Sequence, residues 1–182
     1  MRMILLDRDG VLNEDRSDYV KSPDELILVP GAASAVARLN QAGVLTVVVT
    51  NQGAIGRGLF DLDMLALIHQ KLHAELAREG AHIDEILFCP DHPDHPTERR
   101  KPAPGMLLEA LSRHGGVAEE TPMIGDTLRD MQAAAAIGCP RMMVRTGHGE
   151  NTLAAGLGDE VQPVLVFADL KAAIDSWLGE PG

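Results

Sequence analysis

The sequence predicts an α/β fold in which a mainly parallel sheet lies between two layers of helices. Short apolar runs alternate along the chain with longer segments of helical periodicity, which is the pattern of repeated strand–helix–strand units. The run VLTVVVT at residues 44–50 is apolar almost throughout, as expected of a parallel strand that is buried on both faces. The 182 residues suit one domain with its own hydrophobic core, which we expect to span residues 1–182.

The expected strands are the short apolar runs between turn residues. They cover residues 3–6, 44–50, 83–89, 122–125, 141–144 and 164–167. The expected helices cover residues 31–43, 62–80, 104–115, 127–138 and 168–179. Asp61 suits the N-cap of the second helix and Gly80 suits its end. Because ligands bind at the carboxyl ends of parallel strands, the residues that follow each strand are the candidates for a site.

Composition excludes several classes of function. The formal net charge of −11 repels phosphate backbones, so we expect no nucleic-acid partner. A small anionic ligand stays compatible with this charge, because a bound cation and a few local Lys or Arg side chains reverse the field inside one pocket. An aromatic content of 3% leaves few side chains for a large apolar interface, and we expect a monomer.

The chain shows no targeting or membrane segment. No stretch approaches the roughly 20 apolar residues that span a bilayer, and the N-terminus lacks the basic and apolar regions of a signal peptide. Two cysteines, Cys89 and Cys139, are too few for a disulfide framework and fit a reducing compartment. We therefore expect no membrane partner and a cytoplasmic location.

Two aspartates follow the first expected strand. Asp7 and Asp9 are separated by one residue and followed by Gly10, which permits a sharp turn. On an extended strand residues i and i+2 point the same way, so the two carboxylates would repel each other unless a cation lay between them. Hard oxygen ligands of this kind suit Mg²⁺. The alternative from the pattern alone is a pair of loop acids that caps the next element.

Further polar residues follow the other strands. Asp126 follows the fourth strand and would supply another metal ligand, with Asp130 one helical turn further on. Thr50 ends the second strand and Lys101 lies in the loop after the third. A hydroxyl, backbone amides and an ammonium would bind phosphate oxygens. Taken singly, each residue has a structural alternative as a strand end, a solvated loop charge or a helix-capping acid.

Together these residues indicate phosphoryl transfer. A carboxylate can attack phosphorus and form an aspartyl-phosphate, while Mg²⁺ and a lysine neutralise the transferring group. A second carboxylate would give a proton to the leaving alcohol and then take one from water. Asp7 suits the nucleophile and Asp9 the acid and base. The non-enzymatic alternative is a receiver domain, but its acceptor aspartate follows a middle strand, where this chain has Thr50 and Cys89.

Four segments resemble, in order, the motifs of the haloacid dehalogenase (HAD) superfamily of phosphohydrolases. They are DRDGVLN, TNQGAIGRG, the lysine of RRKPAPGM, and GDTLRDMQAA, and the likeness runs from Met3 to about Val144. The resemblance implies a HAD-like, Rossmann-like three-layer sandwich and a Mg²⁺ cofactor. No insertion is large enough for a separate cap domain, so segments 14–29 and 90–100 would supply the walls of the pocket.

Within the superfamily, the sequences of these four motifs are similar to those of the family of heptose-bisphosphate and histidinol-phosphate phosphatases. This similarity implies removal of the 7-phosphate of D-glycero-D-manno-heptose 1,7-bisphosphate, a step toward the heptose precursor of lipopolysaccharide, with histidinol phosphate as the alternative substrate. It also implies a role for each matched residue. Asp7 would be the nucleophile and Asp9 the acid and base, while Thr50 and Lys101 would bind the phosphate. Asn51, Gln52 and Arg100 would contact the phosphorylated sugar. Mg²⁺ would be held by Asp7, Asp126 and the backbone carbonyl of Asp9, and Asp130 would contact these ligands without binding the ion.

Many relatives in that family hold a structural zinc in the loop after the third strand, with one cysteine, one histidine and a later Cys-x-Cys. Here the loop reads CPDHPDHPTERRKP and the Cys-x-Cys is missing. Cys89, His92 and His95 would offer only three ligands, whereas a closed structural zinc site has four. We therefore expect a proline-braced loop without zinc, with the three-ligand site as the alternative.

Two histidines, His69 and His73, lie four residues apart in the helix expected at residues 62–80. Side chains at this spacing share one helix face. Because they lie inside a helix and away from the strand ends, we expect both on the helix surface, outside the site.

Overall fold

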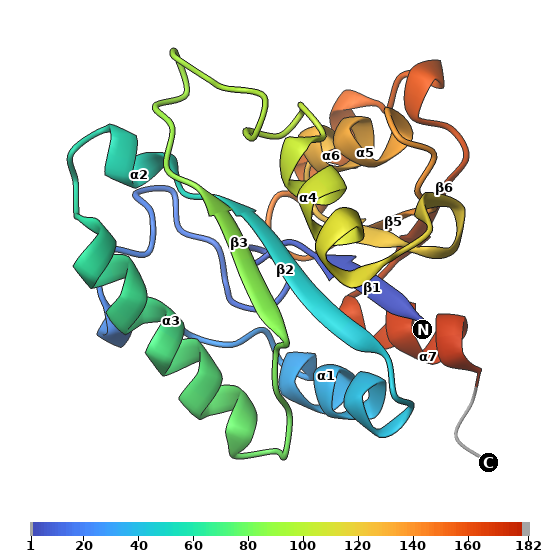
Figure 1. Cartoon of the computed structure of the whole chain (residues 1–182), viewed down its shortest axis with the longest axis horizontal. Helices are drawn as coiled ribbons and strands as arrows, with labels where there is room; N and C mark the ends of the chain where they lie inside the picture. The colour runs from blue at the N-terminus through green and yellow to red at the C-terminus, as the bar shows by residue number, and fades with distance from the viewer. Residues whose placement is uncertain (1, 180–182) are drawn as a thin grey trace.

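The computed structural model of the protein describes residues 2–179, and these residues form one six-stranded parallel sheet in the order β3-β2-β1-β4-β5-β6 (Figure 1). The strands are β1 Met3–Leu6, β2 Leu45–Asn51, β3 Glu85–Cys89, β4 Met123–Gly125, β5 Arg141–Val144 and β6 Val164–Phe167. The strand positions agree with the expected ones to within two residues at each end. The α/β fold with a parallel central sheet is confirmed.

Helices cover both faces of the sheet. One layer contains α1 Ala32–Gln41, α3 Leu62–Ala77 and α7 Leu170–Leu178, and the other contains α4 Gly105–His114 and α5 Leu128–Ala135 (Figure 1). Two short helices were not expected from the sequence: α2 Gly53–Gly56 and α6 Gly149–Ala155. Short 3₁₀ turns lie at Pro23–Glu25, Ala118–Glu120 and Asp159–Val161. Asp61 caps α3 as predicted, because its carboxylate accepts from the backbone N–H of Met64.

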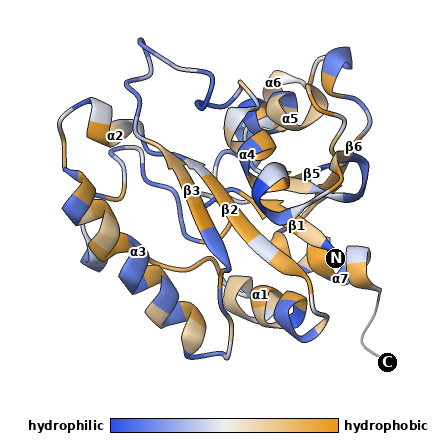
Figure 2. Cartoon of the chain, viewed as in Figure 1, coloured by the Kyte–Doolittle hydropathy of each residue, from blue (hydrophilic) through white to orange (hydrophobic). Residues whose placement is uncertain are grey.

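The two-layer burial follows from the alternation of side chains along β1. Ile4 and Leu6 pack in one cluster with α1, α3 and α7, while Met3 and Leu5 pack in the other with α4 and α5. All four are at most 3% exposed. Figure 2 shows that β2 is hydrophobic along most of its length, whereas α3 carries both hydrophilic and hydrophobic residues. The sheet is therefore buried on both sides, as the apolar runs predicted.

The order of the strands decides where a ligand can bind. The chain builds β1, β2 and β3 outward in one direction, then crosses back and adds β4 on the other side of β1. A crevice opens at such a reversal, outside the carboxyl ends of the two strands that flank it. Asp7 follows β1 and Asp126 follows β4, so both lie at this position.

No separate cap domain is present in residues 2–179. The two predicted loop segments supply part of the walls of the crevice, and Arg57, Arg129 and His148 from other segments line it as well. Asp15, Arg16, Ser17 and Tyr19 line it from one side, and Pro93 and Arg100 line it from the other. Within the described residues, no helix combines the length and the apolar character that crossing a membrane needs.

Replacing Leu72 with alanine tests the buried face of α3. Leu72 is fully buried in the layer between α3 and the sheet, and truncation leaves a cavity there. We expect a loss of about 2–5 kcal/mol in the free energy of unfolding, measured by urea denaturation. Leu67→Ala in the same helix is the matched control, because Leu67 is 47% exposed; we expect a change of about 0.5 kcal/mol or less. Equal losses for the two variants would contradict this packing.

Candidate active site

The carboxyl ends of β1, β2 and β4 bring the predicted residues to one cavity of about 450 Å³. Asp7 directly follows β1, Thr50 is the second-to-last residue of β2, and Asp126 directly follows β4. Lys101 enters from the loop between β3 and α4. The cavity is lined by all four, together with Asp9, Asn51, Arg100 and Asp130.

Lys101 is the positive centre of this cavity. Its ammonium lies 3.1 Å from Asp7 Oδ1 and 2.6 Å from Asp130 Oδ1, and it donates to the Val49 carbonyl oxygen at 2.8 Å. The side chain is almost fully buried. Burial alone would lower the pKa of Lys101, but the charges of Asp130 and Asp7 outweigh it and raise the pKa. The lysine therefore stays charged.

Three carboxylates surround this ammonium. Asp7, Asp126 and Asp130 each present one oxygen within 4.8 Å of the others. Burial, followed by the charges of Asp130 and Asp7, raises the pKa of Asp126 to about 8. Burial also raises the pKa of Asp7 to about 7, although Lys101 partly opposes this. If all three carboxylates were ionised, negative charge would exceed positive charge at the centre of the site, and an additional cation would stabilise that ionised state.

The donors fit Mg²⁺. Oδ1 of Asp126 is buried and has no hydrogen-bond partner in the described structure, which is costly unless a ligand occupies it. Mg²⁺ takes hard carboxylate and carbonyl oxygens and needs only a few protein ligands. The sequence predicts Asp7, Asp126 and the backbone carbonyl of Asp9 as its ligands, and the carboxylates of Asp7 and Asp126 lie in the aspartate cluster. Asp130 belongs to the same cluster, but one of its oxygens is already paired with Lys101.

The segment before α6 holds Asp126 in place. The backbone N–H of His148 donates to Asp126 Oδ2 at 2.7 Å, and the Thr152 hydroxyl donates to the Asp126 carbonyl oxygen at 3.0 Å. Gly10 packs against the same carboxylate with φ of +81°, and a Cβ there would lie 2.2 Å from Asp126 Oδ2. Only glycine fits this position, both for its conformation and for the close approach. His148 and Thr152 were not predicted as part of the site.

Asp130 has two structural partners. Its Oδ2 accepts from the backbone N–H of Thr127 at 3.0 Å and from the Thr127 hydroxyl at 2.6 Å, which completes a capping box at the start of α5. Its Oδ1 faces Lys101. Burial would raise the pKa of Asp130, but Lys101 outweighs burial and lowers it. Asp130 is fully buried, so it is not an acid on the exposed surface of the helix. Asp126 also precedes α5 rather than sharing a helix face with it.

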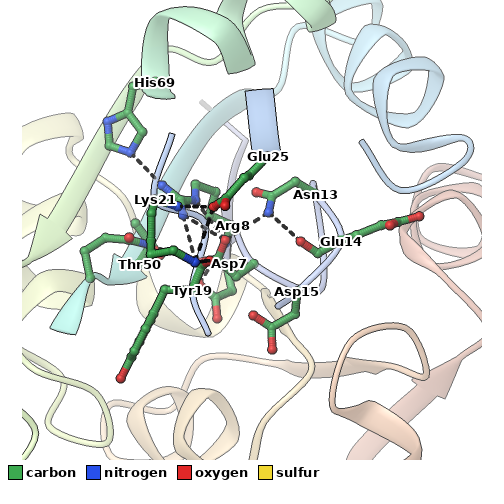
Figure 3. Close-up of polar contacts among 12 residues, drawn as sticks. Asp7, Arg8, Asn13, Glu14, Asp15, Tyr19, Lys21, Glu25, Thr50 and His69 are labelled. Atoms are coloured by element: carbon green, nitrogen blue, oxygen red, sulfur yellow. Dashed lines mark hydrogen bonds and ion pairs between the residues drawn. The ribbon is translucent and has the colours of Figure 1, made fainter. Parts of the chain in front are cut away.

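The carboxylate of Asp9 points away from the acid cluster. It accepts from Arg8 Nη2 at 2.8 and 3.0 Å, from Asn13 Nδ2 at 2.9 Å and from Gln52 Nε2 at 2.9 Å. Figure 3 shows His69 of α3 contacting Arg8, with Asn13 nearby. Burial would raise the pKa of Asp9, but the Arg8 guanidinium outweighs burial and lowers it. The expected repulsion between Asp7 and Asp9 is therefore relieved by an arginine on the Asp9 side.

The remaining predicted residues lie close by in different orientations. Asn51 Nδ2 donates to the Lys101 carbonyl oxygen at 2.9 Å, and the Lys101 N–H donates back to Asn51 Oδ1 at 3.1 Å, which fixes the lysine loop against β2. Gln52 Nε2 also donates to Thr50 Oγ1 at 3.0 Å. Gln52 lies behind the cavity wall and does not line it. Arg100 lines the cavity and donates to the Asp91 carbonyl oxygen at 3.1 Å.

The loop after β3 does not form the three-ligand zinc set. Among residues 2–179, the one group of three metal-binding side chains that converge is the aspartate cluster; Cys89, His92 and His95 do not converge in this way. Asp91 Oδ2 instead accepts from the backbone N–H and the hydroxyl of Thr97, both at 2.7 Å. Hydrogen bonds across the loop therefore stabilise it.

One expectation about the histidines is wrong. His69 is half-buried and its Nε2 lies 3.3 Å from Arg8 Nη1, so it contacts a residue next to Asp7 and Asp9. His73, one turn further along α3, is exposed as expected. Arg8 itself, fully buried, was not predicted as part of the site.

The fold and this site define the class of HAD-like hydrolases. A family model described as HAD-hydrolase-like matches residues 98–173, which include Lys101, Asp126 and Asp130.

The chain belongs to the D-glycero-beta-D-manno-heptose-1,7-bisphosphate 7-phosphatase family of these hydrolases. It is 48% identical to the protein of that name from Bordetella bronchiseptica over 99% of both chains, and 39% identical to the one from Pseudomonas aeruginosa over 97% of both. A crystal structure of D,D-heptose 1,7-bisphosphate phosphatase from B. bronchiseptica, complexed with magnesium and phosphate, superposes with a TM-score of 0.93 at 45% identity over 98% of both chains. A structure of the corresponding phosphatase from Burkholderia thailandensis superposes with a TM-score of 0.77 at 38% identity, covering 99% of this chain and 100% of that one.

Magnesium should stabilise the protein through the aspartate cluster. At about 100 times its dissociation constant, a ligand that binds only the folded state adds about 2.7 kcal/mol, so we expect Mg²⁺ to raise the melting temperature by about 5–10 °C relative to protein in EDTA. In Asp126→Asn the shift should fall below about 2 °C, because one anionic ligand is lost. Thermal unfolding followed by circular dichroism measures both.

The exposed Asp63 supplies the control for this experiment. Asp63→Asn makes the same chemical change outside the site and should retain the full Mg²⁺ shift. A full shift in Asp126→Asn would show that the ion binds elsewhere.

Proposed function

We propose that this protein is a Mg²⁺-dependent phosphatase that removes the 7-phosphate of D-glycero-D-manno-heptose 1,7-bisphosphate through an aspartyl-phosphate on Asp7. The observation that carries the proposal is the charged Lys101 ammonium, which lies 3.1 Å from Asp7 inside a cluster of carboxylates. The names of the relatives support the substrate and favour its β anomer. The same names favour turnover over the receiver-domain alternative.

The first half of the reaction transfers the phosphoryl group to the protein. A carboxylate oxygen of Asp7 attacks phosphorus, and the bond between phosphorus and the sugar oxygen breaks. Lys101 binds the transferring group and neutralises its charge, with the Thr50 hydroxyl beside it. Mg²⁺, held by Asp7, Asp126 and the Asp9 carbonyl, would neutralise further charge on that group. Asp9 must carry a proton at this step, although Arg8 lowers its pKa in the substrate-free structure. It gives this proton to the departing sugar oxygen, which leaves as the alcohol.

The second half of the reaction restores the protein. Asp9, now ionised, takes a proton from a water molecule, and the water oxygen attacks phosphorus. The bond between phosphorus and the Asp7 oxygen breaks, which releases inorganic phosphate and the free carboxylate. Asp9 thus acts as an acid in the first half and as a base in the second, while Lys101 stabilises the phosphoryl group in both.

The walls of the cavity favour a substrate with two phosphates. Four arginines line the cavity around the acid cluster, namely Arg16, Arg57, Arg100 and Arg129. A sugar bisphosphate presents a second anionic group to these side chains, whereas histidinol phosphate presents a cationic amine. The volume of about 450 Å³ also suits a phosphorylated sugar.

We propose that the active form is a cytoplasmic monomer. All residues assigned to the reaction come from one chain, so no second copy is needed to complete the site. Cys89 and Cys139 are free and buried, which is compatible with a reducing compartment.

Asp7→Asn should abolish turnover, because the amide cannot act as the nucleophile. We expect kcat with the heptose bisphosphate to fall by more than about 10³-fold, with the melting temperature retained. Phosphate release is the measurement, with and without Mg²⁺. Asp63→Asn removes a comparable charge on the surface and should leave kcat unchanged. Residual activity near that of the unmodified protein would remove Asp7 from its proposed role.

The choice of substrate should appear in kcat/KM. We expect the heptose 1,7-bisphosphate to exceed histidinol phosphate by at least about 10²-fold, because the arginine-lined walls pair with its second phosphate. Arg100→Met should reduce this ratio mainly by raising KM for the bisphosphate. A higher kcat/KM for histidinol phosphate would instead establish the alternative substrate.

A further inference from the structure

Arg8 occupies an unusual position, between the two aspartates of the site and fully removed from solvent. We propose that Arg8 is a positioning residue that sets where the Asp9 carboxylate rests, and that His69 braces Arg8 from behind. The inference rests on the proposed function, in which Asp9 donates and accepts the protons of the reaction.

The contact between Arg8 and Asp9 fixes both the place and the rotation of the carboxylate. Nη2 of Arg8 lies 2.8 Å from Asp9 Oδ1 and 3.0 Å from Oδ2, and Nε lies 3.2 Å from Oδ1. A guanidinium that contacts both oxygens restricts rotation of the carboxylate in a way that a single donor cannot. Asn13 adds a donor to Oδ1 and Gln52 adds one to Oδ2. Both oxygens of Asp9 therefore have partners on the side away from the acid cluster.

His69 contacts the free edge of the guanidinium. Its Nε2 lies 3.3 Å from Arg8 Nη1, and because a guanidinium has only donors, this nitrogen must accept. Burial, followed by the charge of Arg8, lowers the pKa of His69 to about 3, which keeps the ring neutral and able to accept. The ring also packs edge-on against Phe88, with centroids 6.1 Å apart. Arg8 is thus enclosed between Asp9 and a histidine that is fixed by its own packing.

Stability alone does not account for a buried arginine at position 8. Burying a guanidinium carries a desolvation cost that an ion pair often only offsets. Arg8 also joins no distant element through Asp9, since the two are sequence neighbours. Apart from its contact with His69 of α3, Arg8 acts at Asp9: it determines the position from which Asp9 approaches the leaving oxygen, where proton transfer needs a contact of about 2.6–3.2 Å.

The test uses the leaving group of the substrate. A sugar alkoxide needs a proton in order to leave, whereas 4-nitrophenolate does not, so a misplaced Asp9 slows cleavage of the sugar ester selectively. In Arg8→Met we expect the single-turnover cleavage rate to fall by at least about 10-fold for the heptose bisphosphate and by less than about 3-fold for 4-nitrophenyl phosphate. Arg8→Lys keeps the charge but loses the two-oxygen contact, and should recover only part of the loss.

Arg2→Met is the matched control. Arg2 precedes β1, whereas Arg8 follows it, and the guanidinium carbon of Arg2 lies 4.3 Å from the centroid of the Trp177 ring, away from the site. The same substitution at Arg2 should therefore leave both rates unchanged. A purely structural role for Arg8 would lower both rates equally, and that result would overturn the proposal.

Two further variants keep the test decisive. His69→Phe retains a ring but removes the acceptor, and should give the same selective loss at smaller size even if Arg8→Met does not fold. Equal loss for both substrates in His69→Phe would overturn the bracing role. Asp9→Asn distinguishes the positioning role of Arg8 from the acid role of Asp9 in the proposed function. A selective loss in Asp9→Asn without one in Arg8→Met would refute only the role of Arg8, whereas no selectivity in Asp9→Asn would refute the acid role of Asp9 itself.

Discussion

The buried ammonium of Lys101 is the interaction on which the geometry of the site depends. It contacts Asp7 at the end of β1, Asp130 in α5 and the Val49 carbonyl in β2, so one charge joins three elements that are distant in sequence. A buried ammonium is tolerated only where carboxylates and hydrogen bonds compensate it. The contacts that stabilise the lysine therefore also fix the carboxyl ends of β1 and β2 and the start of α5 relative to one another.

The charge balance around Lys101 connects stability to chemistry. One ammonium faces three buried carboxylates. Burial first, and then the charges of the neighbouring carboxylates, raise the pKa values of Asp7 and Asp126. A phosphoryl group adds still more negative charge, so the site needs a divalent cation before it can bind its substrate with all carboxylates ionised. Asp130 is less available to a cation, because its two oxygens already contact Lys101 and the backbone N–H at the start of α5. The site thus assigns different roles to carboxylates only a few ångströms apart.

The sequence was sufficient to predict the residues that follow the strands. Parallel strands share one carboxyl edge, so Asp7, Thr50 and Asp126 could be placed together without coordinates. Arg8 could not be placed in this way, because strict alternation beyond Leu6 would send it to the opposite side from Asp7 and Asp9. The chain instead leaves β1 at Leu6 and turns, with the Arg8 carbonyl accepting from three successive N–H groups of residues 11–13. Once the chain turns, the period of two no longer applies, and Arg8 and Asp9 come into contact.

Helical spacing was misleading for the same kind of reason. His69 and His73 lie four residues apart, yet one contacts Arg8 and the other faces solvent, because the boundary of the buried face of α3 passes between them. The seven residues of α6 are too short a pattern to predict a helix. Even so, His148 just before this helix and Thr152 within it hold Asp126.

The loop that carries Lys101 shows how hydrogen bonds stabilise the position of a charged residue in the described structure. Asp91 accepts from Thr97 across the loop, and Arg99 ties the loop to α4 through Glu109 and to β3 through the Phe88 carbonyl oxygen. Asn51 then binds the backbone of Lys101 on both sides of its peptide unit. Each of these contacts restrains a different part of the loop, so the lysine is held by several independent hydrogen bonds rather than by one. The position of the ammonium beside Asp7 therefore depends on the whole loop and on its attachment to β2, β3 and α4.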